Sequence, residues 1–182
     1  MNITEKLLKS DYIYNGRIIN LRKDTVILPN EKNAFREIVE HNGGVCVGAL
    51  TDDNQLVFVK QFRNPYMDII LELPAGKRSS KNEDPLQCGI RELKEETGIT
   101  AQNMHFLGEL YPSPGYCDEI IWLYLATGLS YGEQSPDEDE FLEIYKIPLE
   151  NAVEMVMNGE IKDAKTQTLI LKINQLKTQN KI

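Results

Sequence analysis

The chain has 182 residues, of which 20 are basic and 28 acidic, so its formal net charge is −8 at pH 7. Apolar residues make up 41% and charged residues 26%, which is typical of a globular domain with a sizeable core and excludes a disordered or collagen-like chain. Because the charge balance is acidic, the chain lacks the basic patch that nucleic-acid binding requires, and no nucleic-acid partner is expected.

The first part of the chain predicts strands, because apolar and polar residues alternate there with a period of two. Turn-forming residue types separate these segments at 29–31, 42–44 and 52–54. The strands are expected at residues 12–20, 24–28, 35–40, 45–50, 55–61 and 69–73.

A helix is predicted after the polar loop at residues 78–82. Asp84 is the expected N-cap, Pro85 the first helical residue and Gly98 the end. The residues that recur at helical spacing, and that we expect to form its buried stripe, are Leu86, Ile90, Leu93 and Thr97.

The rest of the chain predicts three more strands and two helices, which makes the fold class α+β. Asp163 is the expected N-cap of the last helix. The strands are expected at 104–110, 120–126 and 141–147, and the helices at 149–158 and 163–179.

The cysteines indicate a reducing compartment. Cys46, Cys88 and Cys117 are odd in number and far apart, and His41 and His105 lack the spacing that would complete a zinc site with them. No stretch reaches the roughly 18 apolar residues of a membrane span, and the N-terminus lacks the apolar run of a signal peptide. We therefore expect buried or inert thiols in a cytoplasmic protein without a membrane partner.

Carboxylates gather on one face of the predicted helix. Glu92 and Glu96 project from the same side, and Glu95 stands beside them. Like charges at this spacing destabilise a helix by about 0.2–0.5 kcal/mol, which a bound cation would offset. Hard oxygen ligands suit Mg²⁺ or Mn²⁺, and Arg91 is placed to hold Glu95 by a charge-assisted hydrogen bond. The alternative is a solvated helix face with ordinary ion pairs.

The segment from Gly76 to Ile99 resembles the Nudix hydrolase signature. That signature reads Gly, five residues, Glu, seven residues, Arg-Glu, an aliphatic residue, any residue, Glu-Glu, any residue, Gly and an aliphatic residue. The matching positions are Gly76, Glu83, Arg91-Glu92-Leu93, Glu95-Glu96 and Gly98-Ile99. Six residues, rather than five, separate Gly76 from Glu83, and we expect the extra residue to bulge the loop without loss of the site.

Outside this box the chain is similar to the ADP-ribose pyrophosphatase branch of the superfamily. The resemblance implies a Nudix α/β/α sandwich with a mixed sheet over residues 43–182, preceded by a small antiparallel β subdomain over residues 1–42. It also implies a homodimer built through the N-terminal strands. The segments that carry it are residues 36–41, 59–63, 71–76, 113–119, 137–140 and 163–166, with Pro114 sixteen residues beyond Gly98.

The same resemblance implies roles for individual residues. Two or three Mg²⁺ or Mn²⁺ ions are expected to bind Glu92, Glu96 and the backbone carbonyl of Ala75. Glu140 is the expected additional ligand. The expected catalytic residues are Glu138 as the general base, Glu95 and Arg91.

Substrate contacts are expected from residues outside the box. Arg36 and Arg63 resemble the residues that reach the diphosphate or the terminal ribose, because a guanidinium binds phosphate oxygens in pairs. The loop that contains Pro114, Gly115 and Glu119 resembles the one that recognises the sugar. Among the aromatic residues of the N-terminal strands, Tyr12 is the expected platform for the base, with Tyr14 and Phe35 as alternatives.

The resemblance implies hydrolysis of the pyrophosphate bond of ADP-ribose to AMP and ribose 5-phosphate. Because related enzymes share the frame, GDP-mannose, ADP-glucose or another nucleoside diphosphate sugar is the alternative substrate. A Nudix module that senses a nucleotide without cleaving it is a second alternative, although the chain keeps Glu92, Glu95 and Glu96.

Overall fold

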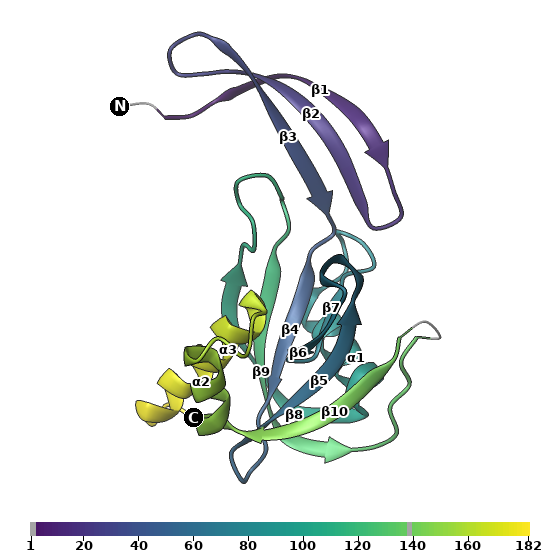
Figure 1. The fold of residues 1–182 in the computed structure, drawn as a ribbon, viewed down its shortest axis with the longest axis vertical. Coiled ribbons are helices and arrows are strands. Elements are labelled where there is room, and N and C mark those ends of the chain that lie inside the picture. The colour runs from purple at the N-terminus through teal and green to yellow at the C-terminus, as the bar shows by residue number, and fades with distance from the viewer. Residues whose placement is uncertain (1–2, 138–139) are drawn as a thin grey trace. The chain divides into compact units, whose positions relative to one another are not determined.

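Three antiparallel strands and one loop make the first of two units in the computed structural model, which describes residues 3–137 and 140–182 (Figure 1). The strands pair in the order β1 (Lys6–Asn15), β2 (Ile19–Ile27), β3 (Asn33–His41). The loop Tyr111–Ile120 belongs to this unit. It adds to β3 through backbone hydrogen bonds from Val39 N to Tyr116 O (2.7 Å) and from Asp118 N to Val39 O (3.0 Å).

The prediction of one strand over residues 12–20 is wrong. Strand β1 ends at Asn15, and the chain turns at Gly16, whose N–H donates to Ile19 O at 3.0 Å. A Cβ at Gly16 would lie 2.5 Å from the Tyr14 ring, so the close approach favours glycine there. The alternation of apolar residues continues through this turn to Ile18, which is why periodicity did not reveal it.

The second unit, formed by Gly44–Leu110 and Ile121–Ile182, contains two sheets. One is mixed, because β4 (Gly44–Ala49) runs parallel to β9 (Ile121–Tyr131) while the other pairs are antiparallel. Its order is β7 (Ala75–Lys77), β4, β9, β8 (Ile99–Leu110). The other sheet is antiparallel, in the order β10 (Leu142–Pro148), β5 (Gln55–Arg63), β6 (Asp68–Glu72), and a short 3-10 helix, η1 (Asn64–Tyr66), joins β5 to β6.

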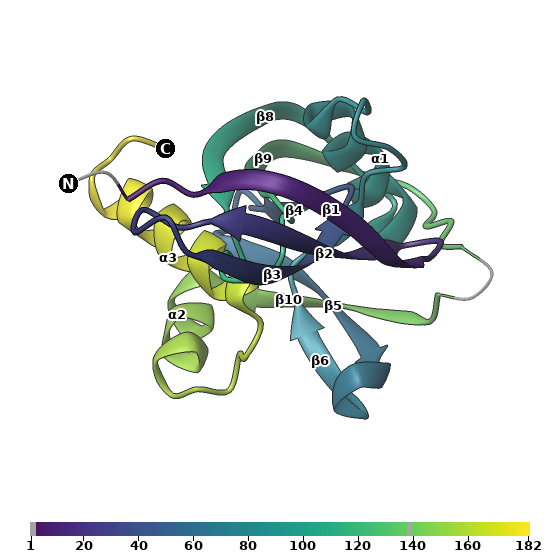
Figure 2. The same cartoon turned by 90° about the horizontal axis from the view of Figure 1, so that it is seen from above.

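Helices cover both faces of β4, all of whose residues are buried (Figure 2). Val45 and Val47 pack with Leu93 of α1 (Pro85–Thr97). The alternate position Gly48 faces α3 (Ala164–Thr178), where a Cβ would lie 2.4 Å from Ile173 Cδ1. Helix α2 (Leu149–Met157) packs on α3. The expected α+β sandwich with a mixed sheet and a separate antiparallel N-terminal sheet is confirmed.

Helix α1 begins and ends as predicted. The Asp84 carboxylate accepts hydrogen bonds from Leu86 N (2.7 Å) and Gln87 N (3.3 Å), and Gly98 ends the helix with φ 69°. The expected apolar stripe is partly wrong, because Ile90 is 40% exposed. The buried positions of α1 are Cys88, Gly89, Glu92, Leu93, Glu96 and Thr97.

Strand β7, where Cys46 pairs with Ala75, was not predicted as a strand. Among the described residues, the structure has no helix long and apolar enough to cross a membrane.

Replacement of Gly98 by alanine tests the end of α1. The new Cβ would lie 2.3 Å from Gly132 O, at a left-handed φ that costs alanine energy. We expect Gly98→Ala to lower the free energy of unfolding by about 1–3 kcal/mol in urea titrations. Gly115→Ala is the control, since no heavy atom lies within 4 Å of its added Cβ. Equal stability of the two variants would contradict the tight contact.

Candidate functional site

Two buried carboxylates of α1 lie directly beneath the backbone of β7. Glu92 is 9% exposed and Glu96 is 3% exposed. Ala75 N donates to Glu96 Oε2 at 3.0 Å, and a Cβ at Gly76 would lie 1.9 Å from Glu92 Cδ. The structure thus brings together Ala75, Glu92 and Glu96, and any side chain at position 76 would have to displace the Glu92 carboxylate.

Arg91 joins the carboxylates on the more exposed side of α1. Its Nη1 lies 2.8 Å from Glu92 Oε1 and 2.9 Å from Glu95 Oε2, and its Nη2 lies 3.2 Å from Glu83 Oε1. The sequence predicted the pair with Glu95, and the structure adds the other two. One guanidinium therefore partly balances three negative charges.

The loop between β7 and α1 accommodates its extra residue by folding back on itself. The Glu83 carboxylate accepts a hydrogen bond from Ser79 N at 2.5 Å. Arg78 donates from Nε to Glu83 O at 2.8 Å and from Nη2 to Lys81 O at 2.5 Å, and its guanidinium lies 4.7 Å from the centre of the Trp122 ring. Glu83 therefore keeps its contact with Arg91 although the loop is longer than in the Nudix signature.

The charges of Glu92 and Glu96 are poorly compensated. Burial raises the pKa of Glu96 to about 8, and the nearby charges of Glu92 and Glu140 add to the effect against the Ala75 N–H. Burial also raises the pKa of Glu92, despite its contact with Arg91. Because a bound cation would favour the ionised form of both groups, these hard oxygen ligands fit a divalent ion such as Mg²⁺.

Side chains alone do not complete an ion site in this conformation. Within residues 3–137 and 140–182, no three His, Cys, Asp or Glu side chains are grouped as a metal would require. A Mg²⁺ ion keeps several waters and shares its remaining positions with substrate phosphates, so two carboxylates and a backbone carbonyl form a sufficient protein contribution. The chemistry of the donor set therefore agrees with the expected metal.

The loop after β9 carries the other acidic candidates. Glu140 is half-buried and close enough to the α1 carboxylates for its charge to raise the pKa of both Glu92 and Glu96. Glu138, the expected general base, lies outside the described residues. Its role stays a prediction.

Arg63 is held by a carboxylate that the sequence analysis did not single out. Its Nε lies 2.6 Å from Glu72 Oε1 and its Nη2 lies 2.9 Å from Glu72 Oε2. Lys165 Nζ lies 2.5 Å from the same Oε2. Glu72 is 2% exposed. The sequence did contain a signal for Glu72, because it is the one charged residue of the strand predicted at 69–73.

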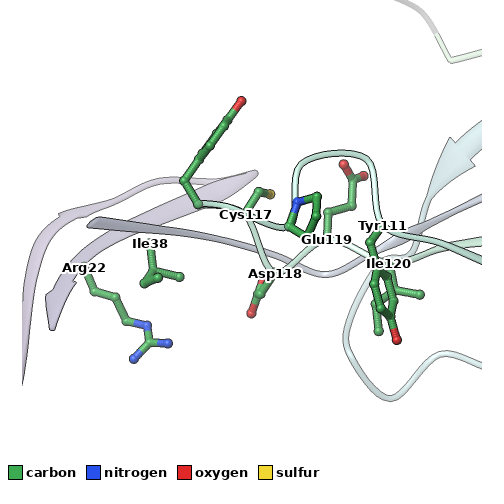
Figure 3. Close-up of a pocket in the computed structure, with 9 residues that line it drawn as sticks. Arg22, Ile38, Tyr111, Cys117, Asp118, Glu119 and Ile120 are labelled. Carbon is green, nitrogen blue, oxygen red and sulfur yellow. The ribbon is translucent and has the colours of Figure 1, made fainter. Parts of the chain in front are cut away.

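The loop Tyr111–Ile120 and the N-terminal strands line an open cavity of about 360 Å³ within the first unit (Figure 3). Pro114 and Glu119, both expected to contact the sugar, line it. Arg22, which was not predicted, also lines it and forms ion pairs with Asp24 (2.8 Å) and Glu40 (3.0 Å). The other lining residues are Ile38, Tyr111, Tyr116, Cys117, Asp118 and Ile120.

The remaining predicted substrate residues lie elsewhere on the first unit. Tyr12 is exposed, and its hydroxyl is 3.4 Å from Glu40 Oε1. Arg36 forms an ion pair with Glu5, with Nε 3.1 Å from Oε2. A Cβ added at Gly115 would have no heavy atom within 4 Å, so this part of the loop is open. Arg36 belongs to the first unit and Arg63 to the second, and Arg36 is not among the residues that line the described cavity.

The pKa of Glu96 predicts how the stability of the metal-free chain depends on pH. The folded chain keeps this proton up to about pH 8, whereas an ordinary glutamate loses it near 4.5, so stability falls as pH rises through this interval. Glu96→Gln is expected to flatten the profile and to be about 3 kcal/mol more stable than the parent at pH 8. Urea unfolding between pH 5 and 8 (roughly the titration window) in EDTA measures this. Glu154→Gln, at an exposed position, is the control. Parallel profiles of stability against pH for the parent and both variants would contradict the raised pKa of Glu96.

Gly76→Ala tests the close passage of β7 over Glu92. The added Cβ would displace the carboxylate, so we expect Mn²⁺ affinity to fall about 10–100-fold in calorimetric titrations. In the control Gly89→Ala, on α1, the new Cβ meets atoms only at 3.5 Å or beyond. Unchanged Mn²⁺ affinity in Gly76→Ala would show that Glu92 is not a metal ligand.

Comparison with known proteins shows which families the chain resembles. The NUDIX domain model matches residues 40–168, and the model of the nucleoside diphosphate sugar hydrolase N-terminal domain matches residues 5–39. The chain is 44% identical to an ADP-ribose pyrophosphatase of Bacillus subtilis (strain 168) over 91% of its length and 90% of that protein. It is 44% identical to a methanol dehydrogenase activator of Bacillus methanolicus, over 89% of its length and 88% of that protein.

A solved structure described as an ADP compounds hydrolase has the same fold. It superposes with a TM-score of 0.86 at 20% sequence identity and covers 100% of both chains. The buried glutamates of α1, the signature that contains them and the match to both domain models lead to one conclusion: the chain belongs to the Nudix hydrolase family.

Proposed function

We propose that the chain hydrolyses the diphosphate bond of ADP-ribose to give AMP and ribose 5-phosphate. The observation that carries this proposal is the buried pair Glu92 and Glu96 beneath β7, whose negative charge is suited to a divalent ion. The extensive identity with the Bacillus subtilis ADP-ribose pyrophosphatase supports the substrate.

Mg²⁺, or Mn²⁺ in its place, would be held by Glu92, Glu96 and the Ala75 carbonyl, with Glu140 as a further ligand. The two or three ions of the proposal would neutralise the phosphate oxygens and make the attacking water more acidic. Glu95 supports this cluster through its bond to Arg91.

The chain's own residues then perform the proton transfer and the positioning. Glu138 is the proposed base that takes a proton from the attacking water. Arg91 keeps Glu92 and Glu95 in place. The new bond forms between water oxygen and one phosphorus, and the bond from that phosphorus to the bridging oxygen breaks. Each product therefore leaves with one phosphate.

The residues proposed to recognise the substrate are those that the resemblance implies. Arg63 and Arg36 bind the diphosphate or the terminal ribose, the Pro114–Gly115 turn and Glu119 bind the sugar, and Tyr12 stacks on the base. Arg22 lines the same cavity as Pro114 and Glu119, which supports a role for that cavity in binding a polar group.

A homodimer in the cytoplasm completes the proposal. We assign residues 1–42 to a subdomain for dimerisation and substrate contact, and residues 43–182 to the hydrolase domain. Large apolar side chains exposed on the N-terminal strands support an interface, because a partner would remove them from water. They include Leu7, Leu8, Tyr12, Ile13, Tyr14 and Phe35.

Another nucleoside diphosphate sugar is the second candidate substrate, because the N-terminal domain model is that of nucleoside diphosphate sugar hydrolases in general. A nucleotide sensor that does not cleave its ligand is disfavoured, since Glu92, Glu95 and Glu96 are all present.

The decisive test is chromatography of products after incubation with Mg²⁺ and ADP-ribose, ADP-glucose, GDP-mannose or a dinucleoside polyphosphate. We expect AMP and ribose 5-phosphate from ADP-ribose at the highest kcat/KM. Glu96→Gln should remain folded and lose about 100-fold or more in kcat, because a neutral amide is a poor Mg²⁺ ligand. Glu154→Gln is the control. Binding of ADP-ribose without release of AMP would instead favour a sensor.

A further inference from the structure

The first turn of α3 contacts the segment that leads from β6 into the site. Thr166 Oγ1, fully buried, accepts a hydrogen bond from Leu73 N at 2.9 Å. Lys165, the preceding residue, reaches Glu72 Oε2 at 2.5 Å. In each contact the two residues are 93 positions apart in the sequence. Leu73 and Glu72 lie two and three residues before Ala75.

Lys165 is itself fixed by the start of α3. Its Nζ lies 3.0 Å from Asp163 Oδ1, while Asp163 Oδ2 accepts the N-capping hydrogen bond from Thr166 N at 3.0 Å. The side chain of Lys165 is 14% exposed. A buried ammonium with two carboxylate partners is held in one place, since leaving them would cost its desolvated charge both interactions.

Glu72 transmits this constraint to Arg63. Its Oε2 accepts hydrogen bonds from Lys165 Nζ and Arg63 Nη2, and its Oε1 accepts one from Arg63 Nε. Burial alone would raise the pKa of Glu72, but the bonds to Arg63 and Lys165 outweigh burial and hold this pKa below its ordinary value. Glu72 is therefore an anion whose orientation depends on both cations.

The fork with Glu72 holds one edge of the Arg63 guanidinium. The fork with Glu72 uses Nε and Nη2, and Nη1 takes no part in it. The positive charge of Arg63 is among the causes that lower the pKa of Glu96, although burial outweighs them. A planar guanidinium fixed along one edge presents its other edge in a defined direction.

We propose that Lys165 is a positioning residue that, through Glu72, orients Arg63 for the diphosphate of the substrate. This inference rests on the proposed function for the identity of the ligand. Lys165 does not touch the substrate. It supplies the second cation that keeps the Glu72 carboxylate in the plane required by the Arg63 fork.

A double-mutant cycle tests the proposal on the full chain. The probe is an ADP-ribose analogue with a methylene group in place of the bridging oxygen, whose Kd in Mg²⁺ is measured by calorimetry. We expect Lys165→Met to weaken binding about tenfold in the parent and less than about twofold in Arg63→Met, because the effect acts through Arg63. Lys165→Arg should restore most of the affinity. Exposed Lys162→Met, three residues before Lys165, is the control and should bind as the parent does.

Equal weakening in the two backgrounds, or none in the parent, would overturn the proposal. A structural role alone would lower thermal stability and weaken binding to the same extent with or without Arg63. Thermal unfolding of each variant is therefore measured beside Kd.

A spectroscopic measurement separates failure of this proposal from failure of the proposed function. The Arg63 Nε proton, in its 2.6 Å bond to Glu72, should give a downfield, exchange-protected signal in ¹H–¹⁵N spectra that disappears in Arg63→Met. We expect Lys165→Met to lose this protection and Lys162→Met to retain it. Retained protection in Lys165→Met would overturn the positioning role even if the parent proved to bind another ligand.

Discussion

The passage of the β7 backbone over two buried glutamates is the constraint on which the site depends. Ala75 contributes an N–H to Glu96, and Gly76 leaves the space that Glu92 occupies. Both carboxylates are fixed because α1 is capped by Asp84 and anchored by Leu93 in the core. Burial disfavours the ionised form of both groups, and a bound divalent cation would favour it.

Two arginines balance this charge from different directions. Arg91 bonds Glu83, Glu92 and Glu95 from the more exposed side of α1. Arg63 approaches from β5 and is itself restrained by Glu72. Because guanidinium groups stay charged at any physiological pH, neither contact changes with protonation of the arginine. The arginines thus contribute permanent positive charge, whereas burial raises the pKa of Glu96 to about 8.

Local signals in the sequence predicted much of this structure. The ends of α1 followed from Asp84 and Gly98, and the helix face that carries Glu92 and Glu96 followed from their spacing. The turn at Gly16 was missed because the apolar alternation continues across it. The ion pair between Lys165 and Glu72 could not be predicted, since the two residues lie 93 positions apart and only the packing of α3 brings them together. The burial of Glu92 and Glu96 likewise depends on β7, which no local pattern revealed.

Arg78 closes the loop before α1 through contacts with the backbone and with one aromatic ring. Its guanidinium stacks on Trp122 and bonds main-chain carbonyl oxygens of Lys81 and Glu83, which every amino acid supplies. These two hydrogen bonds of Arg78 therefore do not depend on which side chains the loop residues carry. Substitutions in the loop that keep this backbone path therefore preserve the Arg78 contacts that precede the start of α1.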